Sequence, residues 1–270
     1  MEKMNEKLGV SFKSDSSDVQ KYIYGNTVDE LIDGLALIKD GKFINQFVDE
    51  FKGLTPEQLL KLDEIMLTTY DAKEIIKYAK RRKETINTQK YQDKLVELKD
   101  IERLIKFTSF AIRPDIVKTE KAVIDYGKPN DGIYLLEEIE GVCKEKIKSF
   151  ILSCEDAYSA YQLIRILIDK QEQILDIDIL EAKRIVKQSK RMSVICAWAR
   201  DIGNVTEMED VTIEYGTARD MYDFAKLVKG ADIEKIRTAI EQKDDIIIKY
   251  NFKKDFPKPI VKKSFWSKLK

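Results

Sequence analysis

The sequence predicts an all-α fold, an α-solenoid of about eight two-helix repeats of roughly 28 residues. Short helix-start signals recur at Asp115, Cys143, Asn204 and Asp232, in steps of 28, 61 and 28 residues. A fixed period of this size is typical of helical repeat arrays. Hydrophobic residues make up 43% of the chain, while only eleven glycines and five prolines occur in 270 residues. This composition disfavours β-rich and disordered chains.

The step of 61 residues spans about two repeats. Asp178-Ile179 supplies a helix start inside it. We therefore expect a continuous array in which every unit packs only on its neighbours.

The first elements follow from apolar spacing and helix punctuation. Residues 1–20 are polar, and apolar residues at helical spacing then predict helices near 28–36 and 43–51. Gly41 is expected to separate these two helices, and Gly53 to end the second.

The next helix is predicted from Thr55-Pro56, a threonine cap followed by proline at the first helical position. Asp71 starts its partner helix. The unit that covers roughly 86–113 is the least regular, because its apolar spacing matches the other copies poorly.

The second helix of several units carries an aromatic residue, then alanine, then a basic residue. We expect the ring to fill the gap between units, the alanine to allow close approach, and the basic residue to complement the helix dipole. The three copies are Tyr78-Ala79-Lys80, Trp198-Ala199-Arg200 and Phe224-Ala225-Lys226.

Short turns at 126–132, 215–217 and 243–245 have the length that joins antiparallel helices. The last predicted helix begins at Ile246, and the register fails beyond Asp255. The chain is thus divided into a polar segment (1–20), a helical-repeat array (21–255) and a basic aromatic tail (256–270).

Global composition excludes several functional classes. The 48 basic and 48 acidic residues cancel, so net charge does not steer the chain to nucleic acid. No histidine is present, which removes the usual general base and the commonest metal ligand. We expect no enzymatic activity, cofactor, metal or small-molecule ligand.

No apolar run approaches the roughly 18 residues of a membrane span, and the first residues lack the apolar core of a signal peptide. Cys143, Cys154 and Cys196 show no CxxC spacing. They are interpreted as small buried hydrophobic residues in a reducing compartment, which predicts a cytoplasmic protein.

The segment FAKLVKGADIEKIRTAI at 224–240 resembles helical repeat arrays of bacterial and phage proteins, with units of the type FAxxVxGADI. Their overall architecture is similar to that of HEAT-like α-solenoids. The resemblance implies a non-enzymatic scaffold or inhibitor that binds another macromolecule, most often a protein. A specific version is a phage-encoded inhibitor of a bacterial defence complex.

Two basic segments are candidate binding sites. One is the run Lys80, Arg81, Arg82 and Lys83. The other is a stripe at helical spacing formed by Lys183, Arg184, Lys187, Lys190 and Arg191. Either segment has the chemistry to bind phosphates, so a nucleic-acid-associated scaffold is the alternative function. The simpler interpretation is a solvated helix end, and we then expect charge substitutions at Arg81 and Arg82 to leave folding intact.

Aromatic residues supply the remaining candidates. Trp266, with Phe265 and Leu269, forms one apolar face of the basic tail, which suits a cap on the last repeat, a partner's groove or a membrane surface. Tyr158, Tyr161, Tyr215 and Tyr222 suit a binding groove, but we expect most of them to fill the gaps between repeats, with their hydroxyl groups at the surface.

Overall fold

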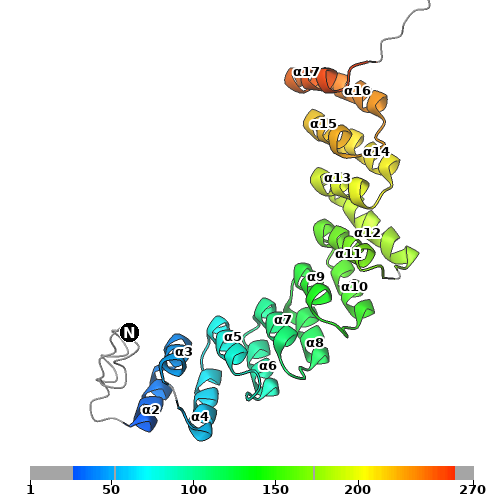
Figure 1. Cartoon of the computed structure of the whole chain (residues 1–270). Coiled ribbons are helices and arrows are strands. Elements are labelled where there is room, and N and C mark those ends of the chain that lie inside the picture. Colours follow the sequence, from blue (N-terminus) through cyan, green and yellow to red (C-terminus); the bar gives the residue numbers. More distant parts are fainter. Residues whose placement is uncertain (1–26, 52, 173, 259–270) are drawn as a thin grey trace, which may run out of the picture. The chain divides into compact units, whose positions relative to one another are not determined.

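The computed structural model describes residues 27–51, 53–172 and 174–258, and this part of the chain is all-helical without a strand (Figure 1). The predicted fold class is confirmed. The described helices are α2 (Val28–Ile38), α3 (Gly41–Glu50), α4 (Pro56–Leu67), α5 (Ala72–Arg81), α6 (Thr88–Glu97), α7 (Ile101–Phe110), α8 (Ile116–Tyr126), α9 (Pro129–Glu138), α10 (Lys144–Ser153), α11 (Ala157–Asp169), α12 (Asp176–Ser189), α13 (Met192–Asp201), α14 (Val205–Tyr215), α15 (Ala218–Leu227), α16 (Ile233–Glu241) and α17 (Ile246–Asp255).

These helices form eight consecutive pairs, from α2–α3 to α16–α17. The first helix of each pair begins 28 to 32 residues after the first helix of the pair before it. The predicted start signals Asp115, Asn204 and Asp232 are the residues that precede α8, α14 and α16. The helix predicted near Asp178 is α12, which begins earlier, at Asp176.

Most second helices begin in the same way. An aspartate before the first turn accepts hydrogen bonds from backbone N–H groups that have no partner inside the helix. These aspartates are Asp40, Asp71, Asp100, Asp156 and Asp245.

The chain divides into two compact units, which meet within α10 between Ile147 and Lys148. In unit 1, the second helices α3, α5, α7 and α9 contact one another in sequence. In unit 2, α11, α13, α15 and α17 do the same. The first helices α12, α14 and α16 lie along one side of this row (Figure 1). Each unit is therefore a series of stacked helix pairs.

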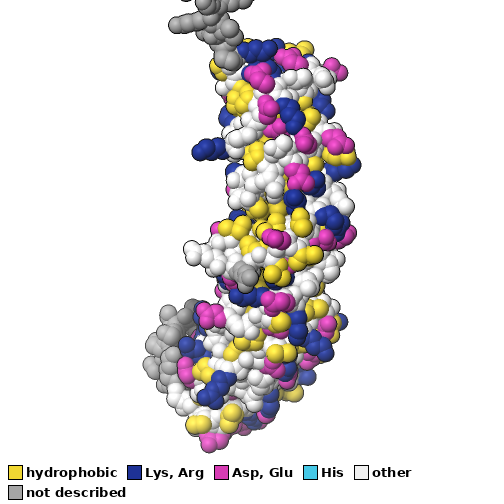
Figure 2. Space-filling model, turned by 90° about the vertical axis from the view of Figure 1, so that its right-hand side faces the viewer, with side chains coloured by type: hydrophobic (Ala, Val, Ile, Leu, Met, Phe, Trp, Pro, Cys, Tyr) yellow, Lys and Arg dark blue, Asp and Glu magenta, His cyan; other side chains and the backbone are white. Residues whose placement is uncertain are grey.

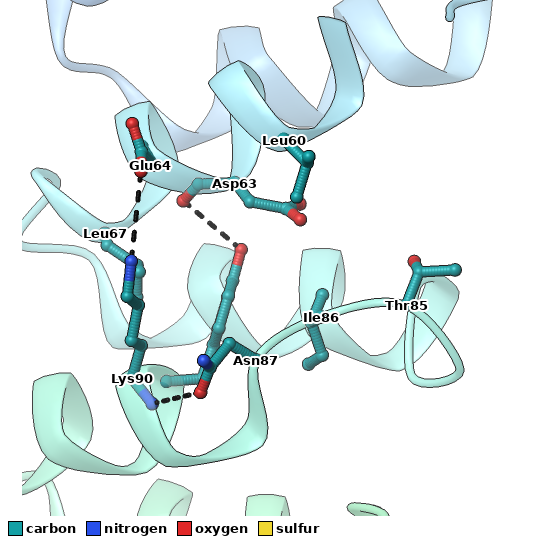
Figure 3. A pocket seen from close by; sticks show the side chains of 9 residues that line it. Leu60, Asp63, Glu64, Leu67, Thr85, Ile86, Asn87 and Lys90 are labelled. Atoms are coloured by element: carbon teal, nitrogen blue, oxygen red, sulfur yellow. Dashed lines mark hydrogen bonds and ion pairs between the residues drawn. The ribbon is translucent and has the colours of Figure 1, made fainter. Parts of the chain in front are cut away.

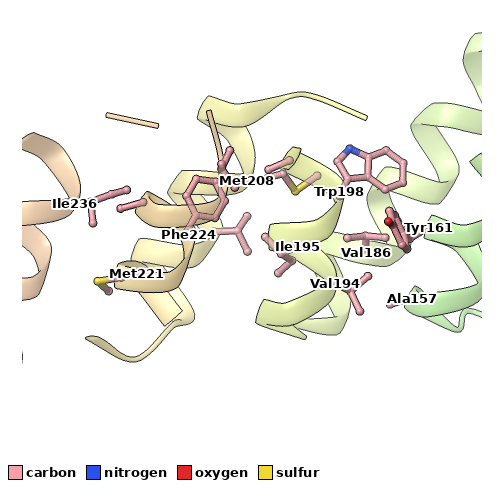
Figure 4. Close-up of a cluster of buried hydrophobic side chains, with 14 of the residues drawn as sticks. Ala157, Tyr161, Val186, Val194, Ile195, Trp198, Met208, Met221, Phe224 and Ile236 are labelled. Carbon is pink, nitrogen blue, oxygen red and sulfur yellow. The ribbon is translucent and has the colours of Figure 1, made fainter. Parts of the chain in front are cut away.

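One position holds the core of every repeat together. The seventh residue of each second helix is large and at most 1% exposed, and its side chain fills the space between repeats as predicted for the aromatic–alanine–basic pattern. These residues are Phe47, Tyr78, Phe107, Leu135, Leu163, Trp198, Phe224 and Phe252. Figure 4 shows Trp198 and Phe224 among the buried side chains of unit 2.

A second recurring position is polar. It lies at the equivalent place in each first helix from α4 to α16. We call the residues at this position the linking column: Asp63, Gln92, Glu120, Lys148, Lys183, Glu209 and Arg237. Six of these residues are buried, and the Lys183 side chain is only 18% exposed. Burying a polar group costs free energy unless it forms a hydrogen bond or an ion pair. The element that packs against each column residue must therefore supply a suitable donor or acceptor.

Three members of the column bind the backbone at the start of the next first helix. Gln92 Oε1 accepts a hydrogen bond from the N–H of Asp115 at 3.0 Å. Glu120 accepts from the N–H of Cys143 at 2.5 Å, and Glu209 accepts from the N–H of Asp232 at 2.7 Å.

Three further members use charge, and Asp63 pairs with Arg82. Lys148 Nζ donates to Asp178 at 2.9 Å, and Lys183 Nζ donates to Glu207 at 2.8 Å, in each case to a carboxylate in the first turn of the next first helix. In the last described repeat, Arg237 donates to the carbonyl of Phe256 at 2.8 Å.

Two first helices begin one turn early. Asp63 and Lys183 are the eighth residues of α4 and α12, whereas the column residue is the fifth residue of α6, α8, α10, α14 and α16. The additional turn thus comes at the start of α4 and α12, and the rest of each helix aligns with the other first helices.

A different contact joins two pairs of successive second helices in unit 2, α11 with α13 and α15 with α17. The hydroxyl of Tyr161 in α11 donates to Asp201 in α13 at 2.5 Å, and that of Tyr222 in α15 donates to Asp255 in α17 at 2.5 Å. Asp201 also accepts from Arg200 Nε at 2.6 Å. The Arg200 hydrogen bonds, aided by Tyr161, lower the Asp201 pKa to about 2.

Three expectations from the sequence are wrong. The unit over 86–113 is not the least regular, because α6 and α7 hold Gln92 and Phe107 at the common fifth and seventh positions. Gly41 is the first residue of α3, and the helices are separated by Lys39 (φ 52°) and Asp40. A Cβ at position 41 would lie 2.9 Å from Glu74 Cβ, so glycine is needed for close approach to α5. Cys154 is exposed at the end of α10 rather than buried, because it follows the last core residue of that helix.

The linking column predicts a specific loss of stability. Replacing Glu209 by alanine leaves the N–H of Asp232 without its acceptor, so we expect the free energy of unfolding to fall by about 1–3 kcal/mol. Urea denaturation measures this. Glu209→Gln, which keeps an acceptor, should recover much of the loss. Asp210→Ala is the matched control, because Asp210 is the exposed neighbour and also pairs with Lys235. Equal effects at both positions would contradict the role of the column.

The lowered Asp201 pKa predicts a pH dependence. The carboxylate binds its proton less readily in the folded chain than in the unfolded chain, so it stabilises the fold above about pH 4. This contribution is lost as the pH falls towards about 2, and Asp201→Asn should lack that part of the acid sensitivity. Unfolding free energies measured between these pH values, in wild type and variant, test this expectation. Parallel pH profiles would contradict it.

Candidate functional site

Exposed apolar side chains gather at the end of α11 and the start of α12. Ile168, Leu175, Ile177 and Leu180 are 43%, 51%, 69% and 57% exposed, and we call them the α12 surface. Figure 2 shows apolar side chains gathered on this side of unit 2, at the level of α11 and α12. Contiguous exposed apolar patches of this kind mark interaction sites on proteins.

The local sequence explains this exposure. Ile174 and Ile179 pack against the core of unit 2, while Leu175 and Leu180, their immediate neighbours, point away from it. The additional first turn of α12 carries Ile177 beyond the part of the helix that is in register. The segment therefore holds more apolar residues than the repeat buries.

The second basic stripe lies along α12 and its C-terminal end, next to this surface. Lys187 donates to Glu207 at 2.7 Å, and Lys183 donates to the other oxygen of the same carboxylate. These two bonds lower the pKa of Glu207. Arg184 donates to Glu181 at 2.8 Å and to Glu155 at 3.1 Å.

The end of the stripe is also occupied. Arg191 lies 3.5 Å from Asp156, and Lys190 Nζ lies 3.8 Å from the centre of the Tyr215 ring. The structure thus brings the five predicted cations together along α12 and the link to α13, and gives four of them a carboxylate partner inside the chain. For these four, the ion pair reduces the capacity to bind phosphate.

The first basic run divides into two kinds of residue. Lys80 and Lys83 are exposed. Arg81 lies 2.8 Å from Asp49 and donates to Asn45 at 3.2 Å.

The Arg82 side chain is largely buried, and the interpretation of this run as a solvated helix end is wrong for it. Its side chain is 9% exposed, and Nη2 donates to Asp63 at 3.2 Å. Nε lies 3.1 Å from the same carboxylate, but without the alignment of a hydrogen bond. The sequence did not reveal this pair because the two residues belong to different helices.

Asp63 is the centre of a buried polar cluster. Tyr78 donates to its carboxylate at 2.8 Å, and the hydroxyl of Tyr91 reaches its backbone carbonyl at 3.5 Å. Burial raises the Asp63 pKa, and the hydrogen bond from Tyr78 and the charge of Arg82 oppose this shift. Burial beside this carboxylate also raises the pKa of both tyrosines.

A pocket of about 320 Å³ lies next to this cluster, between α4, α6 and the link that precedes α6 (Figure 3). Its lining residues are Leu60, Asp63, Glu64, Leu67, Thr85, Ile86, Asn87, Lys90 and Tyr91. The polar lining groups have partners: Asn87 caps α6, Thr85 donates to the Arg82 carbonyl, and Glu64 lies 3.8 Å from Lys90. The polar lining of the pocket therefore consists largely of groups that already interact within the chain.

Trp266, the last predicted binding residue, lies outside the described residues. The sequence analysis missed Leu175, Ile177 and Leu180. The signal is present in the apolar excess between 174 and 180, but the period only predicts a helix start at Asp178 and does not indicate which of these residues remain exposed.

Comparison of the chain with protein-family models, curated proteins and solved structures found no match. Within the described part of the chain, every helix is too short or too polar to cross a membrane.

The buried pair predicts an asymmetry between single and double variants. Asp63→Ala leaves the Arg82 charge buried without its counter-ion, so we expect a loss of about 3 kcal/mol in unfolding free energy. Asp63→Leu combined with Arg82→Met removes both charges and should recover most of that loss. Urea denaturation measures both variants. Arg81→Ala is the control, with a loss below about 1 kcal/mol because Arg81 is partly exposed. A double variant no more stable than the single one would refute the explanation.

Proposed function

We propose that the chain is a non-enzymatic, cytoplasmic helical-repeat protein that binds another protein through the α12 surface, as a scaffold or inhibitor. The observation that supports this proposal is the exposure of Ile168, Leu175, Ile177 and Leu180 in a repeat that departs from the common register. In repeat proteins, departures from the repeat often lie on the binding face.

The energetics favour a protein partner. Removing exposed apolar area from water stabilises a complex by about 25 cal/mol per Å², and a partner with apolar side chains can exploit this. The neighbouring pair of Arg184 and Glu181 supplies charges of both signs beside the apolar side chains. An apolar centre with a polar rim is the usual arrangement of a protein interface.

The alternative is a nucleic-acid-associated scaffold. Exposed Lys80 and Lys83 support it. The ion pairs of Arg81, Arg82, Arg184, Lys187 and Arg191 count against it, because their carboxylate partners would have to be displaced by phosphates.

A more specific form of the proposal is a phage-encoded inhibitor of a bacterial defence complex. Its support is the resemblance of residues 224–240 to helical repeats of bacterial and phage proteins.

The test is recovery of partners from native cells with a tagged full-length chain, half of each sample being treated with nuclease. We expect a stoichiometric protein that survives nuclease. Replacing Ile177 and Leu180 by glutamate should reduce its recovery by about tenfold or more, since buried charges in an interface have no partner. Leu37→Glu is the matched control, because Leu37 is 85% exposed on α2.

Two outcomes would overturn the proposal. Loss of every co-purifying species after nuclease would favour the nucleic-acid alternative. Equal recovery by the glutamate variant and the control would remove the α12 surface from the interaction.

A further inference from the structure

The contact between second helices in unit 2 has two halves. The donor half is a tyrosine at the fifth position and a basic residue at the ninth, and the acceptor half is an aspartate at the tenth position of the second helix in the following repeat. In α15 and α17, Tyr222 and Lys226 both donate to Asp255, at 2.5 Å and 3.2 Å.

A related arrangement joins α11 to α13, in which the tyrosine makes the hydrogen bond and Arg165, at the ninth position, lies 3.9 Å from Asp169 of its own helix. Tyr161 donates to Asp201, and the Arg165 charge contributes to the lowered pKa of that carboxylate. The hydroxyl and the cation are four residues apart and therefore lie on one face of the helix.

The last described helix repeats the donor half. Tyr250 and Lys254 are the fifth and ninth residues of α17, and both are exposed. Among the described residues, no carboxylate from another helix lies opposite Tyr250 as Asp255 lies opposite Tyr222. The donor half of α17 is open within this part of the chain.

The surrounding face of α17 is open too. The first and fifth positions of α15 are 4% and 8% exposed at Ala218 and Tyr222, because α17 covers them. The same positions of α17 are 80% and 68% exposed at Ile246 and Tyr250, and Ile247 beside them is 71% exposed. The terminal repeat of a solenoid ordinarily has a polar outer face, so this apolar face is not that of a cap.

Charge selects the kind of occupant. Lys254 gives this face of α17 a basic character, whereas the neighbouring Lys253 is paired with Glu241. Residues 259–270 contain four lysines and neither aspartate nor glutamate, so this segment cannot supply the missing side-chain carboxylate. A complementary partner must bring an acidic side chain together with apolar ones.

We propose that α17 is a docking surface for an amphipathic helix of another protein that carries an aspartate or glutamate in its last turn. This helix lies along α17 as a further second helix would. Its apolar side chains cover Ile246, Ile247 and Tyr250, and its carboxylate accepts hydrogen bonds from Tyr250 and Lys254. The surface is distinct from the α12 surface and does not depend on it.

The face of α17 that packs against α15 provides the template for a peptide probe. Ile248, Phe252 and Asp255 are the residues with which α17 meets the row of second helices, and they define the required spacing. We would synthesise a fluorescent, stapled helical peptide with isoleucine, phenylalanine and aspartate at these spacings and neutral polar residues elsewhere. Anisotropy would report its binding to the full-length chain.

We expect saturable binding that weakens by about tenfold or more when the chain carries Tyr250→Phe with Lys254→Gln, or when the probe carries asparagine for its aspartate. Lys253→Gln is the matched control, because that lysine pairs with Glu241 at 3.0 Å, and it should leave binding unchanged. Ile177→Glu should also leave it unchanged, which separates this proposal from the proposed function.

Three results would overturn the inference. The first is the absence of saturable binding to the wild-type chain. The second is equal binding by the aspartate and asparagine probes. The third is self-association of the wild-type chain in analytical ultracentrifugation that Tyr250→Phe abolishes, since the occupant would then be a second copy.

Discussion

The architecture depends on burying one polar side chain in the first helix of most repeats. An apolar residue there would pack against any neighbour, but Glu120 or Glu209 has to find a donor, and the nearest one is the N–H group at the start of the next first helix. The backbone group also needs a partner once it is covered. Five repeats, those whose first helices are α6, α8, α10, α12 and α14, thereby fix where the following repeat begins. The seventh-position side chains of the second helices fill the space that this placement leaves.

The two departures from this arrangement coincide with the two most distinctive local features. In α4, the additional turn accompanies the buried Asp63–Arg82 pair and the neighbouring pocket. In α12, it accompanies the exposed apolar side chains of the α12 surface. In a longer first helix, the column residue lies in a later turn. The additional first turn is therefore not needed for the contact between repeats, and its side chains can serve another interaction.

Local signals made most of the fold predictable. Helix caps such as Asp115 and Asp232, and the aromatic–alanine–basic pattern at Trp198 and Phe224, depend on neighbours in sequence. The sites were less predictable because their environment comes from other helices. Arg82 and Lys183 look like members of solvated basic segments, and only the approach of Asp63 and Glu207 shows that they are paired. The spacing of residues in the sequence does not predict which carboxylate pairs with which cation.

The chemistry of the linking column also changes along the chain. An amide in α6 exchanges two hydrogen bonds with Asp115, carboxylates in α8 and α14 accept from N–H groups, and lysines in α10 and α12 meet carboxylates. A repeat that stacked on a neighbour of another type would bury a carboxylate against a carboxylate, or a lysine against an N–H group. Arrays of similar units risk assembling out of order while they fold. The three types of contact along this chain disfavour such mismatched stacking, because repeats of similar shape differ in the group that each must meet.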